Sequence, residues 1–297
     1  YNRIVQHGTQ CRSSPNIREG IQKLREGAIG RIYMARAIAY KVKAGGKNQF
    51  GPTPPELNWD LWLGPTAQKP YNQLAIYRWR FLKDYGSGQT GDQGVHELDI
   101  LRWGLGIDTH PVKVQAMGAM NLFHPGSDED TFTNLTFSCQ YGGGEVMVTF
   151  ETRDGYTNDE AGMGTTYPFV DHQNVVGVIF YGTEGYMIFP DYSSYHTFLG
   201  HKRERGPSAQ EAGEPMMDTP HFANWIAAVR SRKREDLYAE IEQGHLSSAI
   251  CHLANISATV GRTLTFDPQT ERFVGDDEAN RLVKPSYREP YVVPETV

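Results

Sequence analysis

The centre of the chain alternates apolar and polar residues over three consecutive segments, a pattern that favours strands and excludes an all-helical fold. The segments are residues 112–121, 131–141 and 145–153, and residues 176–189 follow as a hairpin turning at residues 182–185. A period of two lets each strand bury one face and expose the other, as antiparallel strands commonly do. The sequence therefore predicts a mainly antiparallel sheet.

Helical patterns flank these strands. Ser14 and Pro15 form a helix start, because serine caps a helix and proline suits its first position. A further helix is expected over residues 92–105, another begins near Thr219, and the last spans residues 239–260. This order of elements, with no regular alternation of strand and helix, indicates the α+β class.

The remaining segments are expected to be short strands, loops and a tail. Residues 31–40 favour a strand, and Ile4 and Val5 favour a shorter, buried one. Loops are expected at residues 41–58, 154–174 and 200–218, and the Pro-rich tail from residue 264 onward is expected to wrap the surface.

The composition excludes several classes of protein. The 297 residues contain 29 Lys and Arg against 35 Asp and Glu, a formal net charge of −6, whereas nucleic-acid binders usually present a basic face. No apolar run approaches the roughly 18 residues that span a bilayer. The three cysteines are far apart and no Cys/His spacing suggests zinc, so neither a disulfide framework nor a metal site is expected.

The segment from Tyr77 to Asp99 holds the strongest candidates for chemistry. A helix beginning near Asp92 places Asp92, His96 and Asp99 on one stripe, opposite an apolar face. A carboxylate four residues before a histidine can orient the imidazole and leave its other nitrogen to act as acid or base. The same spacing also occurs as a cap and surface ion pair, and Asp99 is better explained as a supporting group.

Other residues leave two interpretations open. Gly91 and Gly94 would let a ligand approach the helix start closely. Arg78 and Arg80, which flank Trp79, either bind substrate oxygens or form a solvated pair around a buried ring. Trp59 and Trp62 either stack on a ligand or belong to the core. Gln10 and Arg12 follow the first strand, where α/β sheets bind ligands, or form a plain loop.

Several of these segments, taken in order, resemble the glucose–fructose oxidoreductase, inositol dehydrogenase and rhizopine catabolism family (Gfo/Idh/MocA). The resemblance covers nearly the whole chain. It rests on residues 5–13, which are similar to the last strand of the family's dinucleotide domain, and on residues 57–65, 77–99, 221–230, 244–247, 255–256 and 288–291.

The resemblance implies a fold, a cofactor and site residues. Members of the family have an N-terminal Rossmann domain that binds NAD or NADP, followed by a domain with an open-faced sheet, and they act on sugars, polyols and glycosides. Asp92 and His96 match the family's Asp-x-x-x-His pair, with His96 as acid/base and Asp92 positioning the substrate hydroxyl. The implied substrate-binding residues are Arg78, Trp79, Arg80, Tyr85 and Gln89, and the implied cofactor-binding residues are Gln10, Arg12 and Trp62.

The sequence departs from the family where the cofactor should bind. It has neither a glycine fingerprint after an early strand nor a Glu-Lys-Pro motif. A Rossmann unit needs roughly 120 residues, so residues 1–30 are expected to be a remnant of that domain. Residues 31–297 are then the substrate-binding and oligomerisation domain, with helices on one face of the sheet.

Three functions remain open at this point. The first is an NAD(P)-dependent oxidoreductase of a sugar, polyol or glycoside, whose cofactor domain is mostly absent from the sequence. The second is a cofactor-independent lactonase or glycosidase, and the third a non-catalytic sugar-binding domain. In each case the partner is a small carbohydrate, with neither nucleic acid nor membrane, and a homodimer or homotetramer forms through the open sheet because an exposed sheet face tends to be covered.

Overall fold

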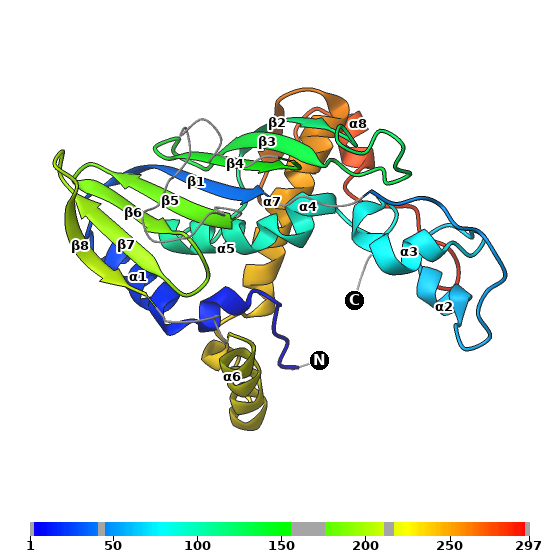
Figure 1. Cartoon of the computed structure of the whole chain (residues 1–297), viewed down its shortest axis with the longest axis horizontal. Coiled ribbons are helices and arrows are strands. Elements are labelled where there is room, and N and C mark those ends of the chain that lie inside the picture. The colour runs from blue at the N-terminus through cyan, green and yellow to red at the C-terminus, as the bar shows by residue number, and fades with distance from the viewer. Residues whose placement is uncertain (1–2, 41–44, 156–175, 211–216, 295–297) are drawn as a thin grey trace.

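In the computed structural model, a single ten-stranded sheet carries helices on one of its faces (Figure 1). The structure describes residues 3–40, 45–155, 176–210 and 217–294. The strand order is β10-β9-β2-β3-β4-β1-β5-β6-β7-β8. Only β1 and β4 pair in parallel, whereas every other pair of neighbours is antiparallel. The predicted α+β fold with a mostly antiparallel, open-faced sheet is therefore confirmed.

The elements have the following bounds. The strands are β1 (Ile32–Tyr40), β2 (Lys113–Ala119), β3 (Asn134–Gln140), β4 (Met147–Arg153), β5 (Val176–Gly182), β6 (Gly185–Phe189), β7 (Tyr195–Leu199), β8 (Glu204–Ala209), β9 (Leu264–Asp267) and β10 (Arg272–Phe273). The α-helices are α1 (Pro15–Arg25), α2 (Trp59–Leu63), α3 (Gln73–Arg78), α4 (Gly88–Asp92), α5 (Gly94–Leu105), α6 (Asp218–Ser231), α7 (Ile241–Val260) and α8 (Asp277–Arg281). Short 3-10 helices are η1 (Gln10–Ser13), η2 (Trp79–Phe81) and η4 (Arg234–Asp236).

Three expectations about regular structure were wrong. Ile4 and Val5 form no strand, because the neighbouring Gln6 makes only an isolated bridge to Glu240. The expected loop at residues 200–218 contains β8, an edge strand that pairs with β7 through its backbone and lacks an apolar repeat. The tail from residue 264 first forms β9, β10 and α8. Most of the expected loop at 154–174, and part of that at 41–58, lie outside the described residues.

The core lies between the sheet and the helices α1, α5 and α7. Helix α1 begins as predicted, with the Ser14 hydroxyl accepting a hydrogen bond from the backbone N–H of Ile17 and with Pro15 at its first position. Its buried residues Ile17, Ile21 and Leu24 join the same apolar cluster as the sheet. Residues 1–30 therefore share a core with the rest of the chain, and their origin as a remnant of a cofactor domain stays a prediction.

A separate arm, residues 45–87, extends from one side of the sheet (Figure 1). It has its own small apolar cluster around Trp59, Leu63 and Ala75. The end of the chain returns to this arm, since Arg288 donates hydrogen bonds to the carbonyls of Thr66 and Gly64 and pairs with Asp60 at 2.8 Å. Residues 282–294 thus wrap the surface as expected.

Two further features concern the cysteines and the length of the apolar helices. Cys11, Cys139 and Cys251 are all buried as thiols, and burial raises the pKa of Cys139 and of Cys251 to about 12. In the described part of the chain, no helix combines the length and the apolar character needed to cross a membrane.

Substituting Gly94 by alanine is expected to lower the free energy of unfolding by about 1–3 kcal/mol, the usual cost of overpacking a core. A Cβ at Gly94, the first residue of α5, would lie 2.5 Å from the ring of Phe150 on β4. Urea denaturation measures the change. Gly142→Ala is the matched control, because a Cβ there meets nothing within 4 Å; equal stability of both variants would contradict this packing.

Candidate active site

The predicted helix over residues 92–105 is present but interrupted at Gln93. Helix α4 ends at Asp92 and α5 begins at Gly94, so Asp92 closes one helix and His96 lies in the first turn of the next. The backbone still continues across the junction, since the N–H of His96 donates to the carbonyl of Gln93 at 3.1 Å. The expected placement of Asp92 at the start of α5 was therefore wrong, although Asp92 and His96 remain one turn apart.

Four of the predicted site residues line one pocket of about 400 Å³ beside α4: Trp79, Arg80, Tyr85 and Asp92. The carboxylate of Asp92 pairs with the guanidinium of Arg80 at 3.0 Å, and both side chains are partly exposed. The guanidinium of Arg80 also lies over the ring of Trp79, with its carbon 5.2 Å from the ring centroid. The pocket thus joins two aromatic rings with an ion pair, a mixture common in small-molecule sites.

The imidazole of His96 is not among the groups that line this pocket. It is half-buried, and its ring centroid lies 6.0 Å from that of Tyr192 in the loop between β6 and β7. The Tyr192 hydroxyl donates a short hydrogen bond to Oε1 of the buried Glu97 and accepts one from Gln93. Burial beside Glu97 raises the pKa of Tyr192, so the phenol stays neutral and holds α5 against this loop.

Two other predicted substrate residues lie outside the pocket. Arg78 pairs with the buried carboxylate of Glu129 at 2.5 Å and lies over the ring of Phe81. Gln89 is only 4% exposed, and neither atom of its amide has a hydrogen-bonding partner among the described residues. An unsatisfied buried amide is uncommon and indicates a contact with water or a ligand, so Gln89 remains a candidate.

Arg12, predicted for the cofactor, is engaged with Asp99. Its guanidinium donates to both carboxylate oxygens of Asp99, at 2.7 and 2.9 Å, and the Ser247 hydroxyl donates to the same carboxylate at 2.7 Å. Asp99 is fully buried, so its expected role as a supporting group agrees with its position and it is not on an open stripe. Arg102, also fully buried, donates to Ser247 on the other side.

The η1 segment is held in place by His221 of α6. The ring Nε2 of His221 lies 3.1 Å from the carbonyl of His7, and its Nδ1 lies 2.9 Å from the hydroxyl of Ser13. Burial lowers the pKa of His221, which keeps the ring neutral, with Nε2–H donating to the carbonyl. Gln10 begins η1 and is half-buried.

Trp62, the third predicted cofactor residue, belongs to the apolar cluster of the arm. It stacks on Trp59 with ring centroids 4.8 Å apart and meets the edge of Tyr85 at the same distance. Trp62 therefore supports one wall of the pocket through Tyr85.

The described residues do not build a site for a whole dinucleotide. Such sites hold the pyrophosphate at a helix N-terminus that follows a parallel strand and a glycine-rich turn. Helix α1 is instead capped by the side chain of Ser14, no parallel strand precedes it, and the nearby Arg12 is committed to Asp99. The described residues therefore lack the features by which such sites hold the cofactor's phosphates.

His252 is a site residue that the sequence did not indicate. It lies on α7 and lines both the pocket beside α4 and a neighbouring cavity of about 530 Å³. His252 follows His245 by seven residues, a spacing that places both on one face of α7. This spacing is the feature of the sequence that could have indicated His252 as a site residue. Desolvation by the surrounding protein lowers the pKa of His252.

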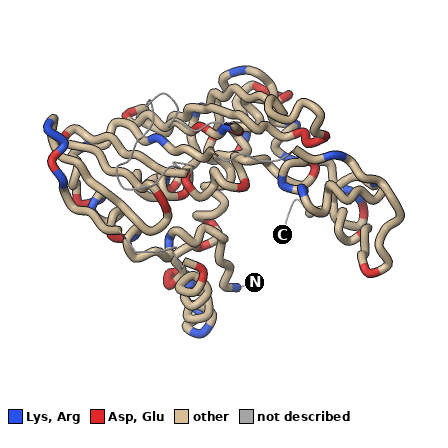
Figure 2. The backbone as a smooth tube through the Cα atoms, viewed as in Figure 1, with Lys and Arg blue, Asp and Glu red and all other residues tan. Residues whose placement is uncertain are grey.

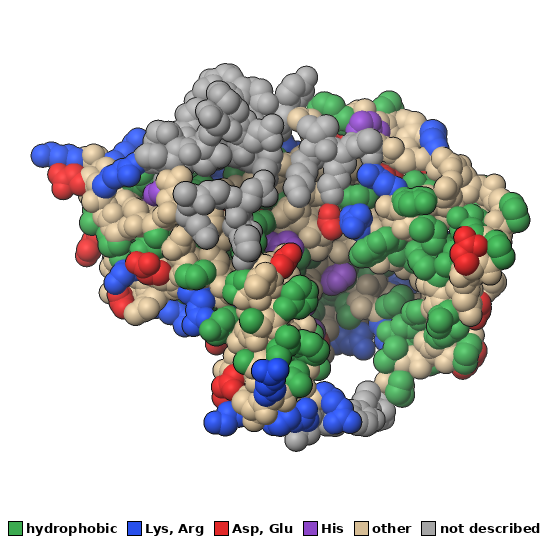
Figure 3. Space-filling view, turned by 60° about the horizontal axis from the view of Figure 1, so that its bottom comes forward, with side chains coloured by type: hydrophobic (Ala, Val, Ile, Leu, Met, Phe, Trp, Pro, Cys, Tyr) green, Lys and Arg blue, Asp and Glu red, His purple; other side chains and the backbone are tan. Residues whose placement is uncertain are grey.

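The surface around these residues has no dominant charge. Figure 2 shows acidic and basic residues interspersed along the described chain, in keeping with a net charge of −6. Figure 3 shows a hollow between the region of α6 and the arm, with histidine side chains at its edge. The pocket beside α4 is likewise lined by residues of the arm, of α4 and of α7.

Comparison with known proteins gives one family match. The model described as "Oxidoreductase family, C-terminal alpha/beta domain" (GFO_IDH_MocA_C2) matches residues 30–159 and 189–293. No curated protein sequence matches the chain.

Solved structures share the fold at low sequence identity. The aldose-aldose oxidoreductase from Caulobacter crescentus complexed with glycerol is 14% identical with a TM-score of 0.59, covering 89% of this chain and 64% of that one. Levoglucosan dehydrogenase in complex with NADH and levoglucosan is 17% identical with a TM-score of 0.58, covering 89% and 66%. A super-repressor mutant of Gal80p from Saccharomyces cerevisiae is 13% identical with a TM-score of 0.58, covering 95% and 67%. The chain thus spans about two thirds of the length of these proteins.

Proposed function

The chain belongs to the Gfo/Idh/MocA oxidoreductase family, and on that premise we propose that it is the substrate-binding part of an NAD(P)-dependent oxidoreductase of a sugar, polyol or glycoside. The observation that supports this most is the pocket beside α4, where Trp79, Arg80, Tyr85 and Asp92 meet. Aromatic faces pack on the C–H groups of a sugar ring, while a guanidinium and a carboxylate bind its hydroxyls.

In this proposal the two members of the Asp-x-x-x-His pair have different tasks. Asp92, paired with Arg80, accepts a hydrogen bond from a substrate hydroxyl and orients it. His96, one turn further on, takes the proton of the hydroxyl that is oxidised and returns one in the reverse reaction. The pocket wall and His96 are separate in this structure, so we expect substrate binding to bring the imidazole within hydrogen-bonding distance.

The cofactor assigned by this proposal is NAD or NADP, which supplies the acceptor for the hydride. The levoglucosan dehydrogenase of similar fold is a complex with NADH. Because the described residues lack the features that hold the cofactor's phosphates, we assign its binding to a dinucleotide-binding domain, with residues 1–30 as the edge of that domain and residues 31–297 as the substrate domain.

The test is oxidation of a panel of aldoses, polyols and glycosides by the full-length gene product with NAD⁺ or NADP⁺. We expect at least one compound to reduce the nicotinamide. Arg80→Ala is expected to raise KM by about 10–100-fold, since hydrogen bonds to charged groups contribute about 1.5–3 kcal/mol. Arg31→Ala, at an exposed position beside β1, is the matched control. Absence of both binding and oxidation across the panel would contradict the proposal.

A second candidate is a sugar-binding protein without catalysis. The Gal80p structure, described as a super-repressor, has the same fold, and Asp92 is already engaged by Arg80. This alternative predicts that a compound from the panel binds, that Arg80→Ala weakens its binding, and that neither nicotinamide is reduced.

We also propose that a homodimer or homotetramer forms through the open face of the sheet. Met117 of β2 and Met147 of β4 are 76% and 54% exposed in a single chain, and covering them removes apolar area from water. Light scattering of the protein at micromolar concentration tests this, and a monomer would contradict it.

A further inference from the structure

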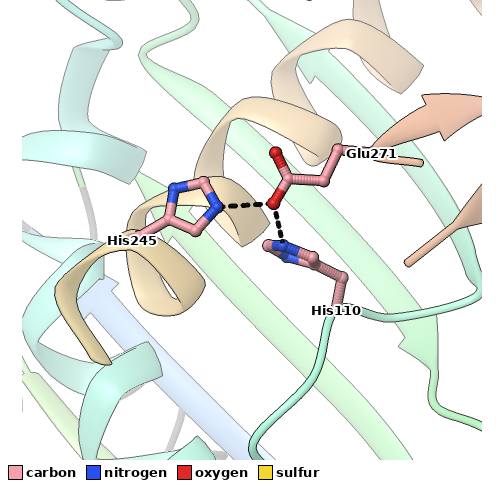
Figure 4. Close-up of side chains that lie close together, drawn as sticks. All are labelled: His110, His245 and Glu271. Atoms are coloured by element: carbon pink, nitrogen blue, oxygen red, sulfur yellow. Dashed lines mark hydrogen bonds and ion pairs between the residues drawn. The ribbon is translucent and has the colours of Figure 1, made fainter. Parts of the chain in front are cut away.

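A cluster of metal-binding side chains lies away from the pocket beside α4. Nitrogen atoms of His110 and His245 and a carboxylate oxygen of Glu271 lie within 4.8 Å of one another, the one such group found among the described residues (Figure 4). His110 comes from the loop between α5 and β2, His245 from the second turn of α7, and Glu271 from the turn between β9 and β10. Three elements distant in sequence thus bring their donors to one point.

Both imidazoles are directed at the same oxygen atom. The Nε2 of His110 lies 2.9 Å, and the Nε2 of His245 2.7 Å, from Oε1 of Glu271. The two rings are perpendicular, with centroids 5.2 Å apart. The donor set is therefore two imidazoles and one carboxylate.

His110 makes this more than a chance meeting of surface groups. Its side chain is 4% exposed, and its Nδ1 is buried without a hydrogen-bonding partner among the described residues. Among the described residues, the ring's hydrogen bond is therefore made at Nε2, toward the cluster. Glu271 is also held in the left-handed region at φ 52°, which is costly for a residue with a side chain.

We propose that His110, His245 and Glu271 bind one Zn²⁺ ion, with an open coordination position toward the adjoining cavity. Two imidazoles and a carboxylate form the ligand set of several zinc sites that keep a fourth position open. Bonds of about 2.0–2.2 Å place tetrahedral donors roughly 3.4 Å apart. The two nitrogens, now 2.9 and 2.7 Å from the Glu271 oxygen, would therefore move about 0.5–0.7 Å away from it, while all three donors already lie within 4.8 Å of one another. Because His245 and Glu271 are about half exposed, they can make this adjustment.

The open position has a defined surrounding. All three ligands line the cavity of about 530 Å³, which also includes Lys83 and His252 of the pocket beside α4. Water, or an oxygen of a molecule bound in this cavity, would complete a tetrahedral site. The ion would also join the turn between β9 and β10 to α7, so the site does not depend on the proposed oxidoreductase function.

The test is metal binding by the protein after treatment with a chelator. Calorimetry should give one Zn²⁺ per chain, Co²⁺ should give the absorption bands of a tetrahedral site, and saturating Zn²⁺ should raise Tm by roughly 5 °C. His245→Ala is expected to weaken binding more than about 100-fold, beyond the loss typical of a residue that only supports a ligand.

Two further variants make the result decisive. Glu271→Gly removes a ligand but suits the left-handed backbone, so it should fold without metal and fail to bind Zn²⁺. His201→Ala removes a histidine from the exposed turn between β7 and β8 and should bind as the wild type does. No Zn²⁺ binding by the wild type, or equal binding by Glu271→Gly and the wild type, would overturn the proposal.

Discussion

Replacing His96 by alanine is expected to lower kcat/KM of the full-length enzyme by about 10²–10⁴-fold, the usual contribution of a general acid–base group. The reason is that oxidation of a hydroxyl requires removal of its proton, and His96 is the imidazole nearest in sequence to Asp92, one turn away across the junction of α4 and α5. The loss should appear in kcat, whereas binding of the substrate should change only a few-fold, because Arg80, Trp79 and Tyr85 remain.

Steady-state kinetics with the compound identified from the panel checks this expectation. The pH profile provides a readout that a merely structural role would not change, since loss of the general base should flatten the dependence of kcat/KM on pH. His201→Ala is the control, as its side chain lies in an exposed turn outside the site. If His96→Ala retains kcat and the pH profile while keeping the wild-type Tm, then His96 is not the acid–base group.

The sequence predicted the strands well because their information is local. In β3, for example, Leu135, Phe137 and Cys139 are buried while the residues between them are exposed, as the period of two requires. The start of α1 is local in the same way, because the cap Ser14 and the following Pro15 are sufficient to predict it. The edge strand β8 was not predicted, because it pairs with β7 through its backbone and buries no apolar face that would produce an alternating pattern in the sequence.

The candidate site was predicted only in part. The segment from Tyr77 to Asp99 supplied Trp79, Arg80, Tyr85 and Asp92 to one pocket, because these residues lie close in sequence. The engagement of Arg12 with Asp99, 87 residues away, depends on how η1 packs against α5, which no local pattern records. The cluster of His110, His245 and Glu271 was missed for the same reason, since its members share no helix or strand.

The second large effect is expected in stability, at the buried ion pair of Arg12 and Asp99. Asp99→Ala should lower the free energy of unfolding by about 3–5 kcal/mol, because it leaves a buried guanidinium without its carboxylate. Arg12 is 5% exposed and Asp99 fully buried, so water cannot replace the lost partner. Arg102 increases the loss of stability further. This arginine is fully buried, which lowers its pKa, and the negative charge of Asp99 favours its charged form.

Urea denaturation of Asp99→Ala, Arg12→Met and the double variant measures the loss in the free energy of unfolding. Comparison of the three variants shows how much of this loss comes from the ion pair. The double variant should lose less than the sum of the single losses, because without Arg12 one of the two cations that depend on Asp99 is gone. Arg102 remains and also interacts electrostatically with Asp99, so the recovery should be partial. Glu26→Ala, which breaks an exposed pair with Lys23, is the control and should change little, since exposed pairs contribute little to stability. Additive losses in the double variant, or a loss in Asp99→Ala no larger than that of the control, would mean that the pair does not hold η1 against α5.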